Sequence, residues 1–226
     1  MHTFSPGNGH GILTDASAAS NADHGGNAEG VAFGDVDNDG DLDLYVGNAN
    51  QPNVLLLNDG HGIFTDASAA SNVDHSGNSH GVAFGDVDND GGLDLYVGNA
   101  NQPNVLLRNA HHGPDDGQHD AAAADWLVVL PLDGAGHRTL HGAAVRVLLA
   151  GTRVLVGLRT VDGGSGYCSQ SAYGAHFGLP PVAGSGPTAT YHYDVEVRPP
   201  GSEEWSVAAE GVAGGITLEW RSGRYI

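Results

Sequence analysis

The stretch GVAFGDVDNDGDLDLYVGN occupies residues 30–48, and GVAFGDVDNDGGLDLYVGN follows at residues 81–99 with almost the same letters. The flanking sequence repeats with the same spacing, since GHGILTDASAASNADHGGN at 9–27 returns as GHGIFTDASAASNVDHSGN at 60–78. The repeat unit is 51 residues long and is present about twice. A repeat of this length indicates a supersecondary unit that stacks on its neighbours, so it decides the architecture of this part of the chain.

Each copy contains an acidic loop with the pattern D-x-D-x-D-G-x-x-D. In such a loop, positions 1, 3 and 5 place side-chain oxygens around one point, and the glycine at position 6 permits a sharp reversal. Position 7 offers its backbone carbonyl, so aspartate in one copy and glycine in the other suit it equally, and position 9 adds a further carboxylate. The predicted ligands are Asp35, Asp37, Asp39, Asp41 and Asp43 in the first loop and Asp86, Asp88, Asp90, Gly92 and Asp94 in the second.

The ligand types in these loops predict a hard cation, because they offer oxygen without histidine or cysteine. Flexible coordination by six to eight oxygens favours Ca²⁺ over Mg²⁺, so we expect about two Ca²⁺ ions, one in each loop. Val46 and Val97 stand where a helix-flanked calcium loop has its bidentate glutamate, which predicts weak binding, with a Kd of about 10⁻⁴–10⁻³ M. A solvated Asp/Asn/Gly turn is the alternative, but two loops in register favour a structural cation that stabilises the folded unit.

The apolar stretches within a unit are short and are separated by Gly, Asn and Asp, which predicts strands and turns. Each unit therefore has about four short strands, and four-stranded units with a period of roughly 40–50 residues are typical of β-propeller blades. The expected fold class is all-β, with two propeller-like blades in residues 1–110. The strands are expected at 31–33, 42–46, 54–57 and 63–65.

The segment 111–124 contains glycine and proline without apolar periodicity, and we expect it to be a linker to a second domain at 125–226. In that domain TYHYDVEVR (190–198) alternates clearly, with tyrosine and valine on one face and histidine and charged residues on the other. The second domain is expected to be an antiparallel β-sheet or sandwich. Its predicted strands are 126–131, 144–150, 153–160, 176–179, 190–198 and 216–220.

The chain has 226 residues and a formal charge of −19, most of it in the first half. Residues 1–120 contain 18 acidic residues and one arginine, whereas residues 121–226 contain 9 acidic residues and 7 arginines. Such a surface repels phosphate backbones and anionic lipid headgroups, so we expect neither nucleic-acid binding nor membrane insertion. The absence of lysine suits a salt-adapted source or a high-GC genome equally. No export signal and no span of about 18–20 apolar residues is visible.

The loops resemble those of the FG-GAP and VCBS repeat families, whose blades carry FGDxDxDGxxDL calcium loops in seven-bladed integrin-type propellers. NDGHGIFTDAS (58–68) is similar to the inter-loop sequence of the cartilage acidic protein family. The second domain resembles the ASPIC/UnbV domain that follows such repeats in that family. The motifs that carry this second resemblance are GAAVRVLLAG (142–151), GGSGYCSQSAYGAHFGLP (163–180) and DVEVRPPG (194–201). The resemblance implies integrin-type blades and an extracellular or cell-surface setting.

Together the loops and the resemblance predict a calcium-binding recognition or adhesion module, secreted or at the cell surface, that binds a protein or glycan and is not an enzyme. The alternatives are an accessory subunit or enzyme of secondary metabolism or polysaccharide processing, and a structural fragment of a larger propeller. Two units are fewer than the roughly three that independent stability usually requires. We therefore expect self-association through open blade faces as well.

Outside the repeats, Tyr167, Ser169, Gln170 and His176 form a candidate polar site, although turn hydrogen bonding explains them equally well. Cys168 among them is expected to be a small buried residue, because a nucleophile would need a paired base and an oxyanion site. The sequence contains no lysine P-loop and no H-E-x-x-H motif. No catalytic constellation is therefore predicted.

Overall fold

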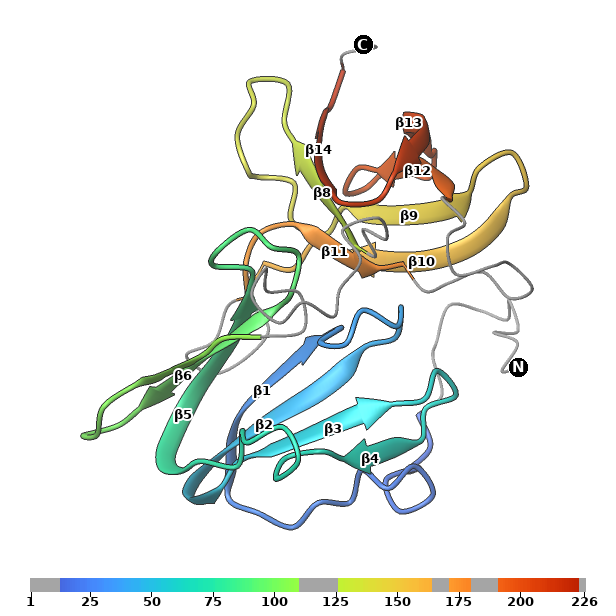
Figure 1. Ribbon diagram of the computed structural model, residues 1–226. Helices are drawn as coiled ribbons and strands as arrows, with labels where there is room; N and C mark the ends of the chain where they lie inside the picture. Colours follow the sequence, from blue (N-terminus) through green and yellow to red (C-terminus); the bar gives the residue numbers. More distant parts are fainter. Residues whose placement is uncertain (1–12, 110–125, 164–170, 180–190, 224–226) are drawn as a thin grey trace.

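The computed structural model describes residues 13–109, 126–163, 171–179 and 191–223. Throughout these ranges every regular element is a β-strand (Figure 1), which confirms the predicted all-β class. The strands form three sheets, and none of these is closed into a barrel. Among the described residues there is no helix with the length and apolar character that a membrane crossing requires.

The first repeat folds into a four-stranded antiparallel meander of the propeller-blade type. Its strands are β1 (Ala28–Gly34), β2 (Asp43–Pro52), β3 (Val54–Asn58) and β4 (Phe64–Asp66). β1 and β3 flank β2, so that Phe33 pairs with Leu44 and Leu44 in turn with Leu56, and β4 pairs with the free edge of β3. Each of the four stretches predicted to be a strand overlaps one of these elements.

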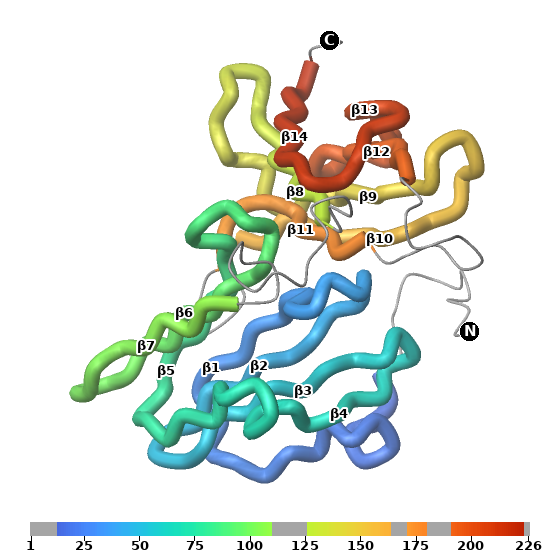
Figure 2. Tube along the Cα trace, viewed as in Figure 1, coloured from blue at the N-terminus to red at the C-terminus, as the bar shows by residue number. Residues whose placement is uncertain are grey.

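The second repeat follows the same path with three described strands. They are β5 (Ser76–Gly85), β6 (Asp94–Asn99) and β7 (Val105–Leu107). The end of β2 pairs with the start of β5, where Gln51 lies opposite Gly77, so both repeats belong to one seven-stranded sheet. The sheet turns strongly between the repeats (Figure 2). A core of buried apolar side chains lies between their faces.

The second domain is a sandwich of a four-stranded and a three-stranded sheet. In chain order its strands are β8 (Trp126–Leu132), β9 (Ala144–Leu149), β10 (Val154–Thr160), β11 (Ala175–Gly178), β12 (His192–Arg198), β13 (Ser206–Ala213) and β14 (Ile216–Arg221). The sheets have the orders β10-β9-β12-β13 and β11-β8-β14. Val145, Phe177 and Val195 lie fully buried in the core that both sheets share. The alternation predicted for 190–198 agrees with the burial of Tyr193 and Val197 in the same core.

Two features of this domain differ from the prediction. β14 runs parallel to β8, whereas an antiparallel arrangement was expected, because nothing local in either strand specifies a partner so far away in the chain. β13 was not predicted, since its sequence SVAAEGVA is mostly exposed and alternates weakly. The predicted linker at 111–124 and the candidate residues Tyr167, Cys168, Ser169 and Gln170 lie outside the described residues.

Candidate metal centre

The two acidic loops connect β1 to β2 and β5 to β6, and they have the same backbone conformation. Asn38 and Asn89 have φ angles of 54° and 60°, and Gly40 and Gly91 have φ angles of 97° and 92°. Asparagine and glycine are the residues that adopt these left-handed conformations most readily. The two copies of the repeat therefore turn at the same two positions of the loop.

Three carboxylates converge in each loop. One oxygen from each of Asp35, Asp37 and Asp43 lies within 4.8 Å of the other two. The second loop brings together the equivalent residues Asp86, Asp88 and Asp94 in the same way. Each triplet offers three oxygen ligands to one point, as a hard cation requires. The other predicted ligands, Asp39, Asp41, Asp90 and Gly92, lie in the same loops outside these triplets.

The last aspartate of each triplet also fastens the loop to its blade. Asp43 is fully buried, and its two oxygens accept hydrogen bonds from the backbone N–H groups of Val36 and Asn58, both at 2.9 Å. Asp94 accepts two equivalent bonds at 2.8 Å, one of them from Asn109. Burial raises the pKa of Asp43 to about 6. A carboxylate oxygen that accepts one N–H bond still has a lone pair for a cation.

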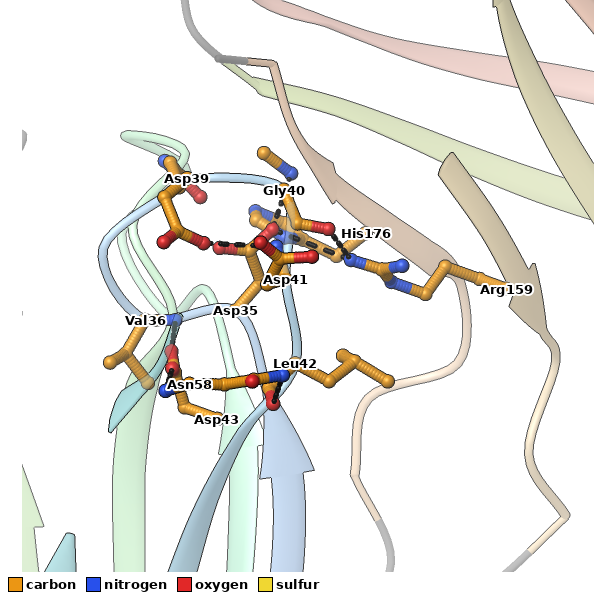
Figure 3. A network of polar contacts seen from close by, with 12 residues as sticks. Asp35, Val36, Asp39, Gly40, Asp41, Leu42, Asp43, Asn58, Arg159 and His176 are labelled. Carbon is orange, nitrogen blue, oxygen red and sulfur yellow. Dashed lines mark hydrogen bonds and ion pairs between the residues drawn. The ribbon is translucent and has the colours of Figure 1, made fainter. Parts of the chain in front are cut away.

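Asp35 is the most distinctive carboxylate of the first loop (Figure 3). Its side chain is buried, and Oδ2 accepts a hydrogen bond of 2.9 Å from the backbone N–H of Gly178 in β11. Within the described part of the chain, Oδ1 has no hydrogen-bond partner. Burial raises the pKa of Asp35 to about 7. A buried carboxylate oxygen without a partner is costly unless a cation or proton satisfies it, so this triplet fits Ca²⁺.

The second domain contacts the first loop directly (Figure 3). The guanidinium of Arg159 in β10 donates a hydrogen bond of 2.9 Å to the carbonyl of Gly40 and lies 3.4 Å from Asp35 Oδ2. The same guanidinium lies over the ring of Phe177, 5.4 Å from its centroid. Gly178 approaches the loop so closely that a Cβ atom there would lie 2.5 Å from the Asn38 backbone. Domain and loop therefore form one continuous packed junction.

The second loop lies beside the first and meets the same strand. The Gly91 carbonyl accepts a hydrogen bond of 3.3 Å from the Asn38 side chain and lies 3.0 Å from Nε2 of His176 in β11. In this loop Asp88 is paired with Arg108. The first repeat has Leu57 at the position equivalent to Arg108, so the triplets differ in net charge although their geometry matches.

Sequence reasoning missed the contributions of the second domain to this site. Arg159 and Gly178 are more than 100 residues from the loop that they contact, and no local pattern marks either one. Arg108 did leave a signal, because it interrupts an otherwise apolar strand that repeats as NVLLL and NVLLR. His176 was a candidate for a polar site of the second domain, with turn hydrogen bonding as the alternative. The structure places its ring at the junction with the second loop.

Comparison with known proteins gives a match in each part of the chain. Residues 35–97 match the FG-GAP-like repeat family, and residues 134–185 match the ASPIC and UnbV family. The chain is 36% identical to human cartilage acidic protein 1 over 104 residues, which is 45% of this chain and 16% of that protein. The mouse protein of the same name is 38% identical over 87 residues, 37% of this chain and 13% of the relative.

A third relative, cartilage acidic protein 1 of Xenopus tropicalis, is 37% identical over 79 residues, covering 34% of this chain and 12% of the relative. The chain therefore spans less than a fifth of the length of the curated relatives it matches. These matches confirm the resemblance that was drawn from the acidic loops and from the motifs of the second domain.

Proposed function

We propose that this chain, in which FG-GAP-like repeats are joined to an ASPIC and UnbV domain, is a calcium-stabilised binding module of extracellular type. The observation that carries the proposal is the pair of carboxylate triplets at equivalent positions of the two repeats. Asp35, Asp37 and Asp43 would hold one ion, and Asp86, Asp88 and Asp94 the other. A bound Ca²⁺ would neutralise each triplet and hold the turn between two strands in one conformation.

The module acts in this proposal by binding a protein or glycan rather than by turnover. The described loops supply carboxylates that suit a structural cation. Because the second domain contacts the first loop, a cation there would also hold the two parts of the chain together. Arg159 and Gly178 contact the first loop at Gly40 and Asp35. Ion binding would therefore fix the second domain against the repeats, which keeps a composite outer surface in one arrangement for a partner. FG-GAP-like repeats and the cartilage acidic protein relatives support a secreted or cell-surface location.

Calcium is expected to raise the melting temperature of the protein. At a free concentration ten times the Kd, one filled loop adds about 1.4 kcal/mol, or about 3–6 °C in Tm for a chain of this size. The measurement is a thermal melt in EDTA and in millimolar CaCl₂, followed by circular dichroism. The double variant Asp37→Ala/Asp88→Ala should lose the shift, and Asp23→Ala, an exposed aspartate outside both loops, should keep it. An unchanged Tm in the wild-type protein would contradict the proposal.

The calcium effect is expected to grow with pH. Burial raises the pKa of Asp35 to about 7 and that of Asp43 to about 6, from ordinary values of 3.8. Protonation of these two groups therefore stabilises the cation-free fold, and this stabilisation is complete below about pH 4. It is lost as the pH rises through 6–7. The free energy of unfolding then falls by up to about 1.4 kcal/mol per pH unit for each group. Calcium requires the ionised carboxylates, so protons compete with it.

Melts at several pH values test this linkage. Between about pH 5 and pH 8, the Tm in EDTA should fall while the difference between CaCl₂ and EDTA widens. A calcium-dependent shift that is larger at the acidic end would show that these buried carboxylates do not bind the ion.

A further inference from the structure

Each repeat has two apolar faces, and the strand register decides which residues belong to each face. We call one the front face and the other the back face. The front face consists of Val31, Phe33, Leu44, Val46, Val54 and Leu56 in the first repeat and of Val82, Phe84, Leu95, Val97, Val105 and Leu107 in the second. The back face consists of Ala32, Tyr45 and Leu55 in the first repeat and of Ala83, Tyr96 and Leu106 in the second.

The core between the repeats is made by the back face of the first and the front face of the second. Tyr45 and Leu55 from one side meet Phe84, Leu95 and Val97 from the other within a single buried cluster. This internal contact shows that a back face and a front face of these sequences can pack together in one buried apolar cluster.

The two remaining faces have the same residues as the buried pair, and they are exposed in part. On the front face of the first repeat, Val46, Val54 and Leu56 are buried in a cluster with Phe64, whereas Val31 is 39% exposed. Phe33 on the front face of the first repeat is 57% exposed, whereas its equivalent Phe84 is 4% exposed. Tyr96 on the back face of the second repeat is 47% exposed, whereas Tyr45 is 0% exposed. Position by position, the six front-face residues and the three back-face residues are identical in the two repeats. The pair of repeats thus presents exposed parts of both halves of an interface that it already forms internally.

We propose that a second copy of this chain docks on these surfaces, with the back face of its second repeat against the front face of the first repeat of its neighbour. The contact would reproduce the internal one at the exposed positions, with Tyr96 and Leu106 of one copy against Phe33 of the next. The polar edge agrees with this register. Glu29 and His80 are equivalent positions of the two repeats and form an ion pair of 3.1 Å across the internal contact. Docking would place His80 of one copy beside Glu29 of the next.

Electrostatics sets the conditions for this association. The first 120 residues contain 18 acidic residues and one arginine, so copies repel one another at long range when salt is low. Salt limits the range of that repulsion to about 8 Å at physiological ionic strength. Calcium bound in the loops would also reduce the negative charge of each copy. Association is therefore expected to strengthen from low to moderate salt, which is the dependence of an apolar contact between like-charged molecules.

The test is sedimentation velocity of the full chain at several concentrations, in moderate salt with millimolar CaCl₂. Wild-type protein should form species larger than a monomer. Phe33→Asp removes the open front face and Leu106→Asp the open back face, so each variant alone should sediment as a monomer. An equimolar mixture of the two variants should form a dimer and nothing larger, because only one intact face remains on each chain. Val207→Asp, which changes an exposed valine of β13, is the matched control and should behave as wild type.

Three results would overturn the proposal. The first is a wild-type chain that stays monomeric at the highest concentration. The second is association that survives in Phe33→Asp or Leu106→Asp alone, which would indicate another surface or a symmetric contact. The third is a mixture that stays monomeric while the wild type associates. Circular dichroism confirms that each variant is folded, and Val31→Asp and Tyr96→Asp replace the first pair on the same two faces if one of them is not.

Discussion

Truncation of Phe84 to alanine is expected to lower the free energy of unfolding of the repeats by about 3–5 kcal/mol, whereas truncation of Phe33 should lower it by less than about 1 kcal/mol. The two phenylalanines occupy the same position of the two repeats and have the same neighbours along the chain. They differ in environment, because Phe84 fills the core between the repeats and Phe33 is largely exposed. Only Phe84→Ala leaves a cavity.

This comparison is best made by urea unfolding at a protein concentration where the chain is monomeric. Far-UV circular dichroism is the appropriate signal, since the three tryptophans, Trp126, Trp205 and Trp220, all belong to the second domain. The denaturant slopes should be similar, so that the difference appears in the midpoint. Equal losses in the two variants would mean that the repeats do not pack through the front face of the second one.

Replacement of Gly178 by alanine is expected to separate the second domain from the first acidic loop. A Cβ atom at this position would lie 2.5 Å from the backbone of Asn38 and from Asp35 Oδ2. Backbone atoms cannot give way as a flexible side chain can, so the added methyl group should cost about 3 kcal/mol in unfolding free energy. It should also break the hydrogen bond from the Gly178 N–H that orients Asp35, and weaken calcium binding in the first loop by about tenfold or more.

Calcium titration by calorimetry in an Asp88→Ala background isolates the first loop for this measurement. Gly85→Ala is the matched control, because a Cβ atom there would meet only the Ala172 Cβ, at the ordinary distance of 3.5 Å. That control should keep the calcium affinity of its background. If Gly178→Ala bound calcium as tightly as the control, the second domain would not position the loop.

The repeat itself could be predicted well from the sequence, because its information is local. The D-x-D-x-D-G pattern predicts the turn that carries Asp35, Asp37 and Asp43, and the short apolar runs predict the strands on either side. The additional residues at the metal centre could not be predicted this way. Arg159 reaches Gly40 only because the second domain packs against the loop, and packing between distant segments leaves no periodic signal in either one.

The sequence of a repeat also does not predict which of its two faces will be buried. Phe33 and Phe84 are identical in sequence context, yet one is exposed and the other is buried. Their burial depends on what lies next to each repeat in space, and the sequence of a single repeat does not specify those neighbours. The same reason explains the parallel pairing of β14 with β8, since the choice of partner strand follows from the whole sandwich rather than from ITLEW alone.

The two described blades share one sheet, so a closed ring built only from such pairs would contain an even number of blades. Copies that join through unlike faces form either a closed ring or an open filament. Propellers usually close with about four to eight blades, and a ring made only of these paired repeats would always contain an even number. Two, three or four copies would give rings of four, six or eight blades, whereas a ring of seven blades would require one blade from another source.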